Sequence, residues 1–431
     1  MSSSKITKVT ARSILDSRGI PTVEARVEAG AAIGVAAVPA GISAGKHEAL
    51  ELRDGDSRWG GLGVSKAVSH VNVEIASVLK GKAVDDQSMV DSVMSDLDGT
   101  PGYSRLGANA VLAVSLAAIK AAAAATGNPL WKYLTVTDKT APVLPVPFCN
   151  VIEGGVHADN PLDVQEFMLV PAGFTKFSEA LRAAAETFYA LEKLLKRRGE
   201  SVNVGAEGGY TPGRLDHQAV LDMLVAAIKE AGYEPGKQIA LALDVAASEF
   251  YRDNGYVFEG HPLDPQQLTA QYASWLESYP IVSIEDPLAE DDWQGWQYLA
   301  SRLSGKVQIV GDDLTVTNLE RVNKALEQEI LSGVILKPNQ AGSYTDAAAV
   351  NQVLSAANIA RIVSHRGRDT TDTTIADLSV GWATGMIKTG SLSRGERVAK
   401  YNRLLEIEQE LGSGAVYAGT AARKLWRKYG S

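Results

Sequence analysis

The sequence predicts an α/β protein in which a (β/α)8-type barrel follows a smaller α+β domain. Three observations lead to this prediction. The chain is 431 residues long, its first third changes from alternating to helical periodicity, and the remainder repeats short apolar runs that end in polar residues. Because 431 residues exceed the usual size of a single hydrophobic core, we expect two domains.

The first 60 residues alternate apolar runs with turn residues and predict an antiparallel meander. The runs cover residues 6–14, 22–27 and 33–38. From residue 64 to about 134 the period becomes helical, with a long Ala-rich helix ending near Thr126. We expect this helical layer to cover the sheet, with the Ala-rich helix buried rather than membrane-spanning.

A Pro-rich segment separates the two predicted domains. Pro142, Pro145 and Pro147 interrupt regular structure and favour a linker or the start of an edge strand. We therefore place the boundary near residue 140, with an α+β capping domain over 1–140 and the catalytic barrel over 141–431.

Seven apolar runs in the second domain each end in a polar or charged residue and are followed by a segment of helix length. The runs cover 202–207, 239–244, 281–285, 307–312, 334–337, 362–365 and 386–388. Their ends lie roughly 23 to 41 positions apart, the length of a βα unit, which predicts parallel strands closed into a barrel. Since strand ends converge in such a barrel, one site should receive Glu207, Asp244, Glu285, Asp312, Lys337, His365 and Lys388.

Composition argues against several other classes of protein. With 42 basic and 51 acidic residues the formal net charge is −9, and no cluster of Lys and Arg suggests a nucleic-acid partner. The single cysteine, Cys149, excludes an intramolecular disulfide and favours a reducing compartment. The first ten residues have no apolar core of signal-peptide length, so we expect a cytoplasmic protein without membrane contact.

Three carboxylates at the ends of consecutive predicted strands indicate a metal site. Asp244, Glu285 and Asp312 offer hard oxygen ligands without sulfur or imidazole, which favours Mg²⁺ over zinc. Asp286, Asp292 and Asp313 are weaker candidates, because alternation along a strand turns the neighbouring side chain away.

Carboxylates with a divalent cation suit the removal of a proton from a carbon next to a substrate carboxylate. The base needs a depressed pKa. Nearby cations lower the pKa of a lysine in this way. Lys337 and Lys388 are both available, and spacing alone does not choose between them. Glu207, in a Gly-rich segment at 205–209, fits the proton donor for a departing hydroxide.

At this point the residues resemble the enolase family across essentially the whole chain. Ser-Ile-Glu-Asp-Pro at 283–287 and Lys-Pro-Asn-Gln at 337–340 are two of the matching strings. The others lie at 16–19, 47–56, 107–110, 165–168, 246–250, 311–314, 364–366 and 387–390. The resemblance implies a TIM-like barrel after a capping domain, dehydration chemistry with two magnesium ions, and at least a dimer.

The resemblance also implies a role for each matching residue. The first magnesium site matches Asp244, Glu285 and Asp312. Lys337 matches the base, and Glu207, assisted by Glu166, matches the acid side. The remaining matches are His157 as a catalytic histidine, Lys388 holding the substrate carboxylate, Gln165 and His365 as substrate contacts, Arg366 as the phosphate-binding arginine, and Ser43 as the mobile-loop serine that reaches the second magnesium.

The chain departs from the family pattern around the phosphate end. The usual loop Ser-Gly-Ala-Ser-Thr-Gly reads Ala-Gly-Ile-Ser-Ala-Gly at 40–45, and the usual serine after the phosphate arginine is Gly367. The usual Asp before the acid is Ala206, and the usual Asn-Gly-Gly begins with Glu153. Each lost hydrogen bond to a charged phosphate costs about 1.5 to 3 kcal/mol if nothing replaces it.

Two enzymatic interpretations follow from these departures. In the first, the protein converts 2-phosphoglycerate to phosphoenolpyruvate with weakened phosphate contacts. In the second, it resembles the carboxyphosphonoenolpyruvate synthases of phosphonate antibiotic pathways and takes a phosphonate-type acid, an interpretation that the altered loop favours. A catalytically silent binding protein is disfavoured by the retained metal, base and acid positions, and a racemase would need a second base across the barrel.

Overall fold

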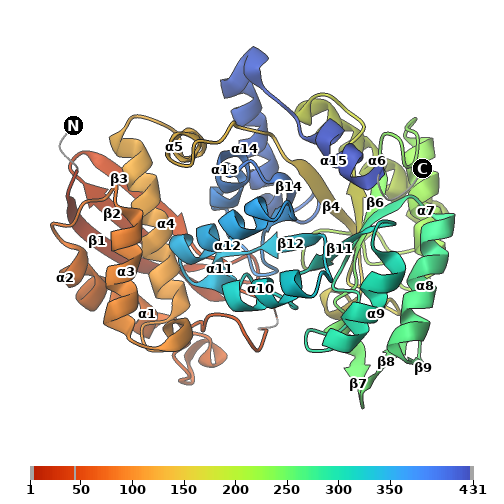
Figure 1. Ribbon diagram of the computed structural model, residues 1–431, viewed down its shortest axis with the longest axis horizontal. Helices are drawn as coiled ribbons and strands as arrows, with labels where there is room; N and C mark the ends of the chain where they lie inside the picture. Colours follow the sequence, from red (N-terminus) through yellow and green to blue (C-terminus); the bar gives the residue numbers. More distant parts are fainter. Residues whose placement is uncertain (1–3, 43–44, 428–431) are drawn as a thin grey trace.

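The computed structural model describes residues 4–42 and 45–427, with side chains up to residue 423. Figure 1 shows an N-terminal unit on one side and a barrel on the other. A three-stranded antiparallel sheet forms the floor of the N-terminal unit, as predicted. Its strands are β1 (Ile6–Leu15), β2 (Pro21–Ala29) and β3 (Ala32–Ala37).

The predicted helical layer covers this sheet. It comprises α1 (Ser65–His70), α2 (Ala76–Leu79), α3 (Gln87–Asp98), α4 (Ala108–Ala125) and α5 (Leu130–Thr137). Helix α4 packs directly on β3 because Gly34 has no side chain: a Cβ there would lie 1.9 Å from the carbonyl oxygen of Ala117. Although α4 is long and apolar enough to cross a membrane, 83% of its apolar window is buried, which confirms the predicted interior helix.

Eight strands close into the barrel in the second unit. They are β4 (Val146–Glu153), β5 (Glu166–Val170), β6 (Ala240–Asp244), β10 (Ile281–Glu285), β11 (Gln308–Gly311), β12 (Gly333–Leu336), β13 (Ala360–Ser364) and β14 (Gly385–Lys388). The strands from β6 onward agree with six of the predicted runs. A (β/α) barrel is therefore confirmed.

The start of the barrel differs from the prediction. Residues 202–207, expected to be a strand, form a loop with an isolated bridge from Val204 to Tyr210, because the glycines that follow allow the chain to turn. The first two strands are instead β4 and β5. Strand β5 runs antiparallel to both neighbours, so the expectation of parallel strands throughout was wrong.

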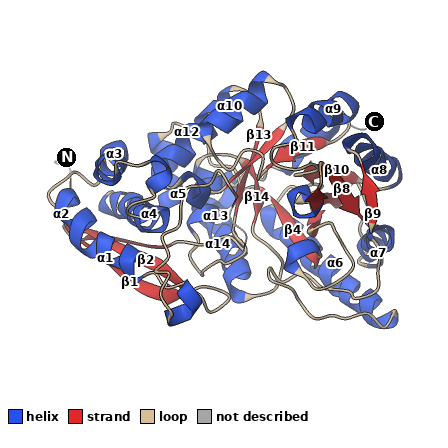
Figure 2. Ribbon diagram, turned by 90° about the horizontal axis from the view of Figure 1, so that it is seen from below, coloured by secondary structure: helices blue, strands red, loops and turns tan. Residues whose placement is uncertain are grey.

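Helices surround the barrel, as Figure 2 shows from below. They are α6 (Phe177–Arg197), α7 (His217–Glu230), α8 (Pro265–Ser278), α9 (Trp293–Leu303), α10 (Leu319–Glu327), α11 (Pro338–Ala341), α12 (Tyr344–Ala356), α13 (Thr374–Gly381), α14 (Gly395–Leu411) and α15 (Gly419–Arg427). Most are amphipathic; α6, for example, buries Phe177, Ala184 and Leu191. A small sheet of β7 (Tyr251–Arg252), β8 (Gly255–Phe258) and β9 (His261–Leu263) follows β6.

The N-terminal unit contacts the barrel at the carboxyl ends of the barrel strands. Ala40 and Arg368, which follows β13, exchange backbone hydrogen bonds of 2.8 and 3.0 Å. The backbone N–H of Ala49 donates to the carbonyl oxygen of Gln340, which follows β12. The segment after β3 therefore lies over the barrel end where the polar strand ends converge.

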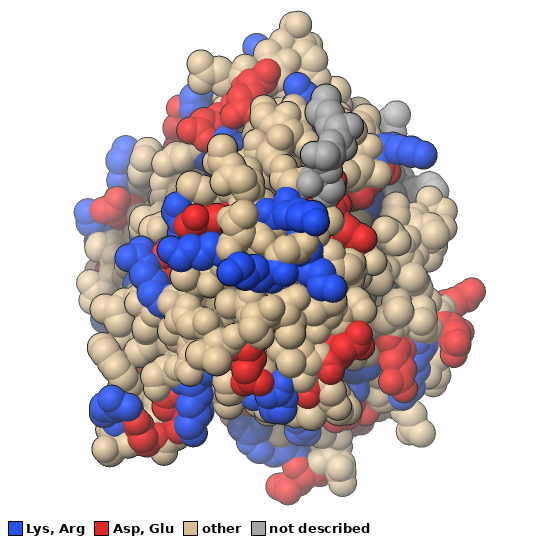
Figure 3. Space-filling view, turned by 90° about the vertical axis from the view of Figure 1, so that its left-hand side faces the viewer, with Lys and Arg blue, Asp and Glu red and all other residues tan. Residues whose placement is uncertain are grey.

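The far end of the N-terminal unit carries both signs of charge. Figure 3 shows a band of Lys and Arg side chains across this face, with Asp and Glu around it. Arg12 pairs with Glu24, and Arg26 pairs with Glu28, on the exposed side of β1 and β2. Exposed pairs of this kind contribute little to stability.

Candidate active site

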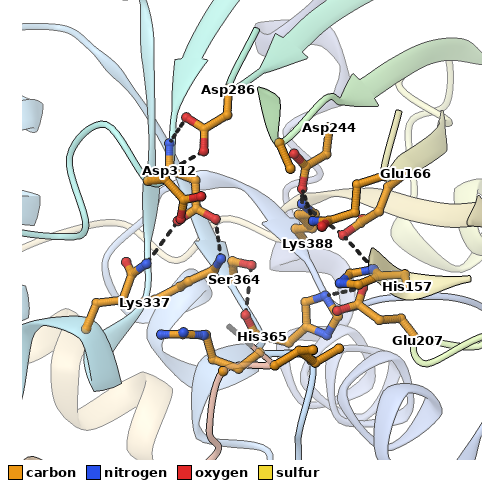
Figure 4. A pocket seen from close by; sticks show the side chains of 18 of the residues that line it. His157, Glu166, Glu207, Asp244, Asp286, Asp312, Lys337, Ser364, His365 and Lys388 are labelled. Carbon is orange, nitrogen blue, oxygen red and sulfur yellow. Dashed lines mark hydrogen bonds and ion pairs between the residues drawn. The ribbon is translucent and has the colours of Figure 1, made fainter. Parts of the chain in front are cut away.

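A pocket opens at the carboxyl ends of the barrel strands, where side chains from many segments meet (Figure 4). Ten of the predicted site residues line it: His157, Gln165, Glu166, Glu207, Asp244, Asp312, Lys337, His365, Arg366 and Lys388. Glu285 is buried directly below the pocket, as its contact with Lys388 shows. The prediction for Ser43 lies outside the described residues.

Lys388, at the end of β14, is the central cation of the site. Its Nζ lies 2.6 Å from Asp244 Oδ2, 2.9 Å from Glu285 Oε1 and 3.3 Å from Glu166 Oε1. Burial alone would lower the pKa of Lys388, but these three carboxylates raise it well above its usual value. Lys388 is therefore charged, which suits a group that binds a substrate carboxylate.

Lys337, which follows β12, lies against the carboxylate of Asp312. Its Nζ donates to Asp312, whose other oxygen accepts from the amide of Gln340 at 3.2 Å. Burial would lower the pKa of Lys337, but Asp312 outweighs it and raises that pKa. From the sequence we expected nearby cations to lower the pKa of Lys337. In the protein by itself, the charge of Asp312 raises that pKa instead.

Asp286 and Asp313, expected to point away, line the pocket instead. The backbone of Asp286 leaves the strand conformation with φ of 41°, which ends the alternation on which that expectation rested. Its carboxylate accepts backbone N–H groups of Asp312 and Asp313 at 2.9 and 2.7 Å. Asp292, by contrast, caps helix α9 and accepts the hydroxyl of Tyr256.

The acidic residues here fit a hard divalent cation. Asp286, Asp312 and Asp313 offer oxygens within 4.8 Å of one another, whereas Asp244 and Glu285, predicted as ligands with Asp312, are outside this cluster and pair with Lys388. Burial, then Asp312, raises the pKa of Asp313 to about 7, and burial with Asp244 raises that of Glu285 well above its usual value. Such mutual repulsion among oxygen ligands is relieved by Mg²⁺.

On the opposite side of the pocket, His157, Glu166 and Glu207 form a second group whose ligand atoms lie within 4.8 Å of one another. His157 Nδ1, Glu166 Oε2 and Glu207 Oε2 are buried without a hydrogen-bond partner within the described protein. Three buried polar atoms of one close group are suited to a water or hydroxyl group supplied from outside the chain.

The two carboxyls of this group differ in charge. Burial, followed by the charge of Glu207, raises the pKa of Glu166 well above its usual value. For Glu207 burial acts in the same direction, but His365, His157 and Arg397 outweigh it and lower its pKa well below the usual range. Of the two carboxyls, Glu166 is therefore the one that holds a proton more readily.

His365, which follows β13, has its tautomer set by Arg397 of helix α14. Arg397 Nη1 lies 2.5 Å from His365 Nδ1, and a guanidinium can only donate, so Nδ1 is the acceptor. Burial lowers the pKa of His365 to about 4, so the ring is neutral and carries its proton on Nε2. Nε2 lies 3.1 Å from Glu207 Oε2.

Arg366, the predicted phosphate ligand, is held in a two-pronged ion pair by Glu48. Nη1 lies 2.7 Å from Glu48 Oε2 and Nη2 lies 3.1 Å from Oε1, with both side chains buried. Glu48 also accepts the backbone N–H of Gly45 at 2.9 Å. A substrate anion would have to compete with Glu48 for this guanidinium.

Ile42 forms an apolar wall beside Arg366. A Cβ on Gly367 would lie 2.5 Å from Ile42 Cγ1 and 2.6 Å from Cδ1. The two departures from the family pattern therefore depend on each other, since the isoleucine occupies the space of a side chain at 367. An apolar group replaces the hydroxyl at this position.

Sequence reasoning missed the contributions of Glu48, Gln340 and Arg397. Glu48 and Gln340 lie within strings that carried the resemblance, so their presence was visible but their contacts were not. Arg397 belongs to no quoted string, and its role depends on the packing of α14 against the loop after β13.

Two family models match the chain. The model described as "Enolase, N-terminal domain" matches residues 6–134, and the model described as "Enolase, C-terminal TIM barrel domain" matches residues 141–426.

Proposed function

Since the chain belongs to the enolase family, we propose that it is a magnesium-dependent carbon–oxygen lyase that removes water from a 2-phosphoglycerate-type acid to form an enolpyruvate. One observation carries this proposal. Lys337 and the Glu166–Glu207 pair lie on opposite sides of one pocket, with Lys388 between them (Figure 4). This arrangement suits removal of a proton from one carbon and loss of hydroxide from the next.

The side chains divide the reaction between them. Lys388 binds the substrate carboxylate and orients it, and Lys337 Nζ takes the proton from the adjacent carbon. The C–H electrons form the new C=C bond while the C–O bond at the next carbon breaks. The departing hydroxide takes a proton from the Glu166–Glu207 pair and leaves as water.

Asp244, Glu285 and Asp312 would hold the first magnesium ion, with Asp286 and Asp313 close to it. When bound, Mg²⁺ supplies positive charge next to the substrate carboxylate and next to Asp312. Asp312 is the group that raises the pKa of Lys337. Neutral Lys337 is the form able to accept a proton. A second magnesium ion, a homodimer and a cytoplasmic location remain predictions.

A second candidate substrate is a phosphonate-type acid, as in the carboxyphosphonoenolpyruvate synthases that the chain resembles. The contact between Ile42 and the Gly367 backbone favours it, because an apolar wall suits a carbon substituent better than a fully oxygenated phosphate ester. The dehydration chemistry is the same for both candidates.

Steady-state kinetics with magnesium separates the candidates. Under the first, 2-phosphoglycerate turns over at the order of 10 s⁻¹, which is ordinary for enzymes. Under the second, kcat/KM is higher for a hydroxy acid that carries a phosphonate. A chain that dehydrates neither acid, although it is folded and supplied with Mg²⁺, would contradict the proposed function.

A further inference from the structure

Glu153 is a buried carboxyl at the end of β4 to which the proposed chemistry gives no role. Its side chain has no exposed surface, and it is surrounded by the loop at 205–209 that carries Glu207. A residue of this kind calls for a physical explanation, because burying a carboxyl is costly unless its oxygens are hydrogen-bonded.

The loop closes around this carboxyl. The backbone N–H of Gly205 donates to the carbonyl oxygen of Gly209 at 2.9 Å and completes a ring of five residues. Inside the ring, Glu153 Oε1 accepts the backbone N–H of Gly209 at 2.6 Å and that of Glu207 at 3.0 Å. Glu153 Oε2 lies 3.2 Å from the same Glu207 nitrogen.

The glycines of the ring leave room for this carboxyl. A Cβ on Gly205 would lie 2.3 Å from Glu153 Oε2, and a Cβ on Gly209 would lie 3.2 Å from Glu153 Cγ. Any side chain at 205 would push the carboxyl out of the ring. The ring and the carboxyl therefore fit each other.

We propose that Glu153 is a positioning residue for the acid side of the reaction, which holds the backbone of Glu207 so that its side chain faces Glu166 and His157. This inference rests on the proposed dehydration. Glu153 acts through Glu207 and does not touch the pocket contents. Two departures from the family pattern also offset each other in charge. The chain has Glu153 where the family usually has asparagine, and Ala206 where the family usually has aspartate.

Glutamine can imitate Glu153 in this role. Burial, followed by the charge of Glu207, raises the pKa of Glu153 to about 8, so the group is a neutral carboxyl at pH 7. A glutamine oxygen accepts two N–H groups in the same way. Alanine removes the acceptor altogether and leaves the N–H groups of Glu207 and Gly209 without it.

The test compares two reactions of the holoenzyme with Mg²⁺. Exchange of the substrate proton next to the carboxylate with deuterated solvent reports on Lys337 alone, whereas dehydration also needs Glu207. In Glu153→Ala we expect dehydration to fall at least about tenfold in kcat, with KM and proton exchange little changed. In Glu153→Gln we expect most of the dehydration rate to return.

Two further variants keep the test decisive. Asp98→Ala is the matched control, because Asp98 is a buried carboxylate that accepts backbone N–H groups of Thr100 and Leu106 far from the pocket. It should lose stability while exchange and dehydration keep their wild-type ratio. If Glu153→Ala does not fold, Gly205→Ala displaces the carboxyl from outside and should give the same selective loss of dehydration.

Three results would overturn the inference. The first is an unchanged kcat in Glu153→Ala or Gly205→Ala, and the second is an equal fall of exchange and dehydration. The third is a glutamine variant as slow as the alanine variant. A wild-type chain that catalyses neither exchange nor dehydration would instead overturn the proposed function, and this inference with it.

Discussion

His365 Nε2 lies 3.1 Å from Glu207 Oε2, and Arg397 fixes the orientation of the ring by donating to its other nitrogen. The histidine is thus neutral and buried, while the pKa of the neighbouring Glu207 carboxyl is lowered. The arrangement keeps the hydrogen-bonding pattern of the acid side defined before substrate binds. It also makes the stability of the fold depend on pH.

We predict that His365 makes a contribution to stability that is lost on mild acidification. Burial lowers the pKa of His365 from 6.5 to about 4. Between these values the unfolded chain binds more protons at this histidine than the folded chain, so the contribution falls as pH decreases, by about 2 kcal/mol from pH 6.5 to pH 5. Buried carboxyls with raised pKa values, such as Asp313 and Glu153, act in the opposite direction, so the contribution is measured by comparing urea unfolding of the wild type and His365→Asn at both pH values.

From pH 6.5 to pH 5 the stability of the wild type should decrease by about 2 kcal/mol relative to that of His365→Asn. His157, whose pKa is also lowered by burial, is present in both proteins and therefore cancels in this comparison. The control is His47→Asn at a partly exposed histidine, which should keep the wild-type slope. Equal slopes in wild type and His365→Asn would contradict the prediction.

Ile42 and Gly367 should be energetically coupled. In Gly367→Ser the new Cβ would meet the side chain of Ile42, which must shift, and we expect kcat/KM to fall at least about tenfold. Ile42→Ala opens the same space, so the double variant should recover most of the loss. The coupling energy in a double-mutant cycle should be about 1 to 2 kcal/mol.

The double variant should also change which substrate is preferred. With a hydroxyl in place of the apolar contact, we expect kcat/KM to move toward the phosphate ester relative to the phosphonate. Kinetics of the four variants with both acids measures this. Strictly additive effects would mean that the two positions act independently.

Magnesium should raise the melting temperature, and a chelator should reverse the increase. A ligand at about 100 times its Kd stabilises the folded state by about 2.7 kcal/mol. Asp244→Asn should reduce this effect strongly, because it removes one carboxylate while Glu285 and Glu166 still pair with Lys388. Thermal unfolding with and without Mg²⁺ provides the measurement.

Asp216→Asn is the matched control for this experiment. Asp216 caps helix α7 by accepting the N–H of Ala219, and asparagine caps helices equally well. The variant should therefore keep the full magnesium effect. The assignment of Asp244 as a ligand would fail if both variants responded to Mg²⁺ like the wild type.

Lys337→Gln should abolish proton exchange and dehydration together. Removal of a general base costs roughly 10² to 10⁴ in rate, and glutamine can still donate to Asp312. Lys237→Gln, at an exposed pair with Glu234, is the control and should leave both rates unchanged. Surviving exchange in Lys337→Gln would point to Lys388 as the base.

Much of this site could be predicted because strand ends carry a local signal. Asp244, Glu285, Lys337 and Lys388 each follow an apolar run, and closure of the barrel brings such ends together. The pattern failed for β4, because Pro147 suggested a linker although it pairs with Ile387 inside the barrel.

Other features of the site depend on contacts between distant segments. Glu207 lies in the pocket as predicted, but a Gly-rich loop presents it instead of the predicted strand at 202–207. The Glu48–Arg366 ion pair joins residues 318 positions apart, and neither local periodicity nor composition reports such a contact. The orientation of Asp286 depended on a single residue with positive φ at the end of β10.

The Glu48–Arg366 pair leads to a last prediction, because it places a carboxylate where a substrate anion is expected. In Glu48→Gln the buried guanidinium loses its ion pair with Glu48, which should destabilise the free protein by about 3 kcal/mol. An anion that restores the charge balance should then bind more tightly. We expect the Kd for inorganic phosphate to fall several-fold, measured by calorimetry with Mg²⁺ present. Glu230→Gln, which removes the partner of Arg197 in an exposed pair outside the pocket, is the control and should leave that Kd unchanged. Weaker phosphate binding in Glu48→Gln would mean that Glu48 orients Arg366 for the anion and does not compete with it.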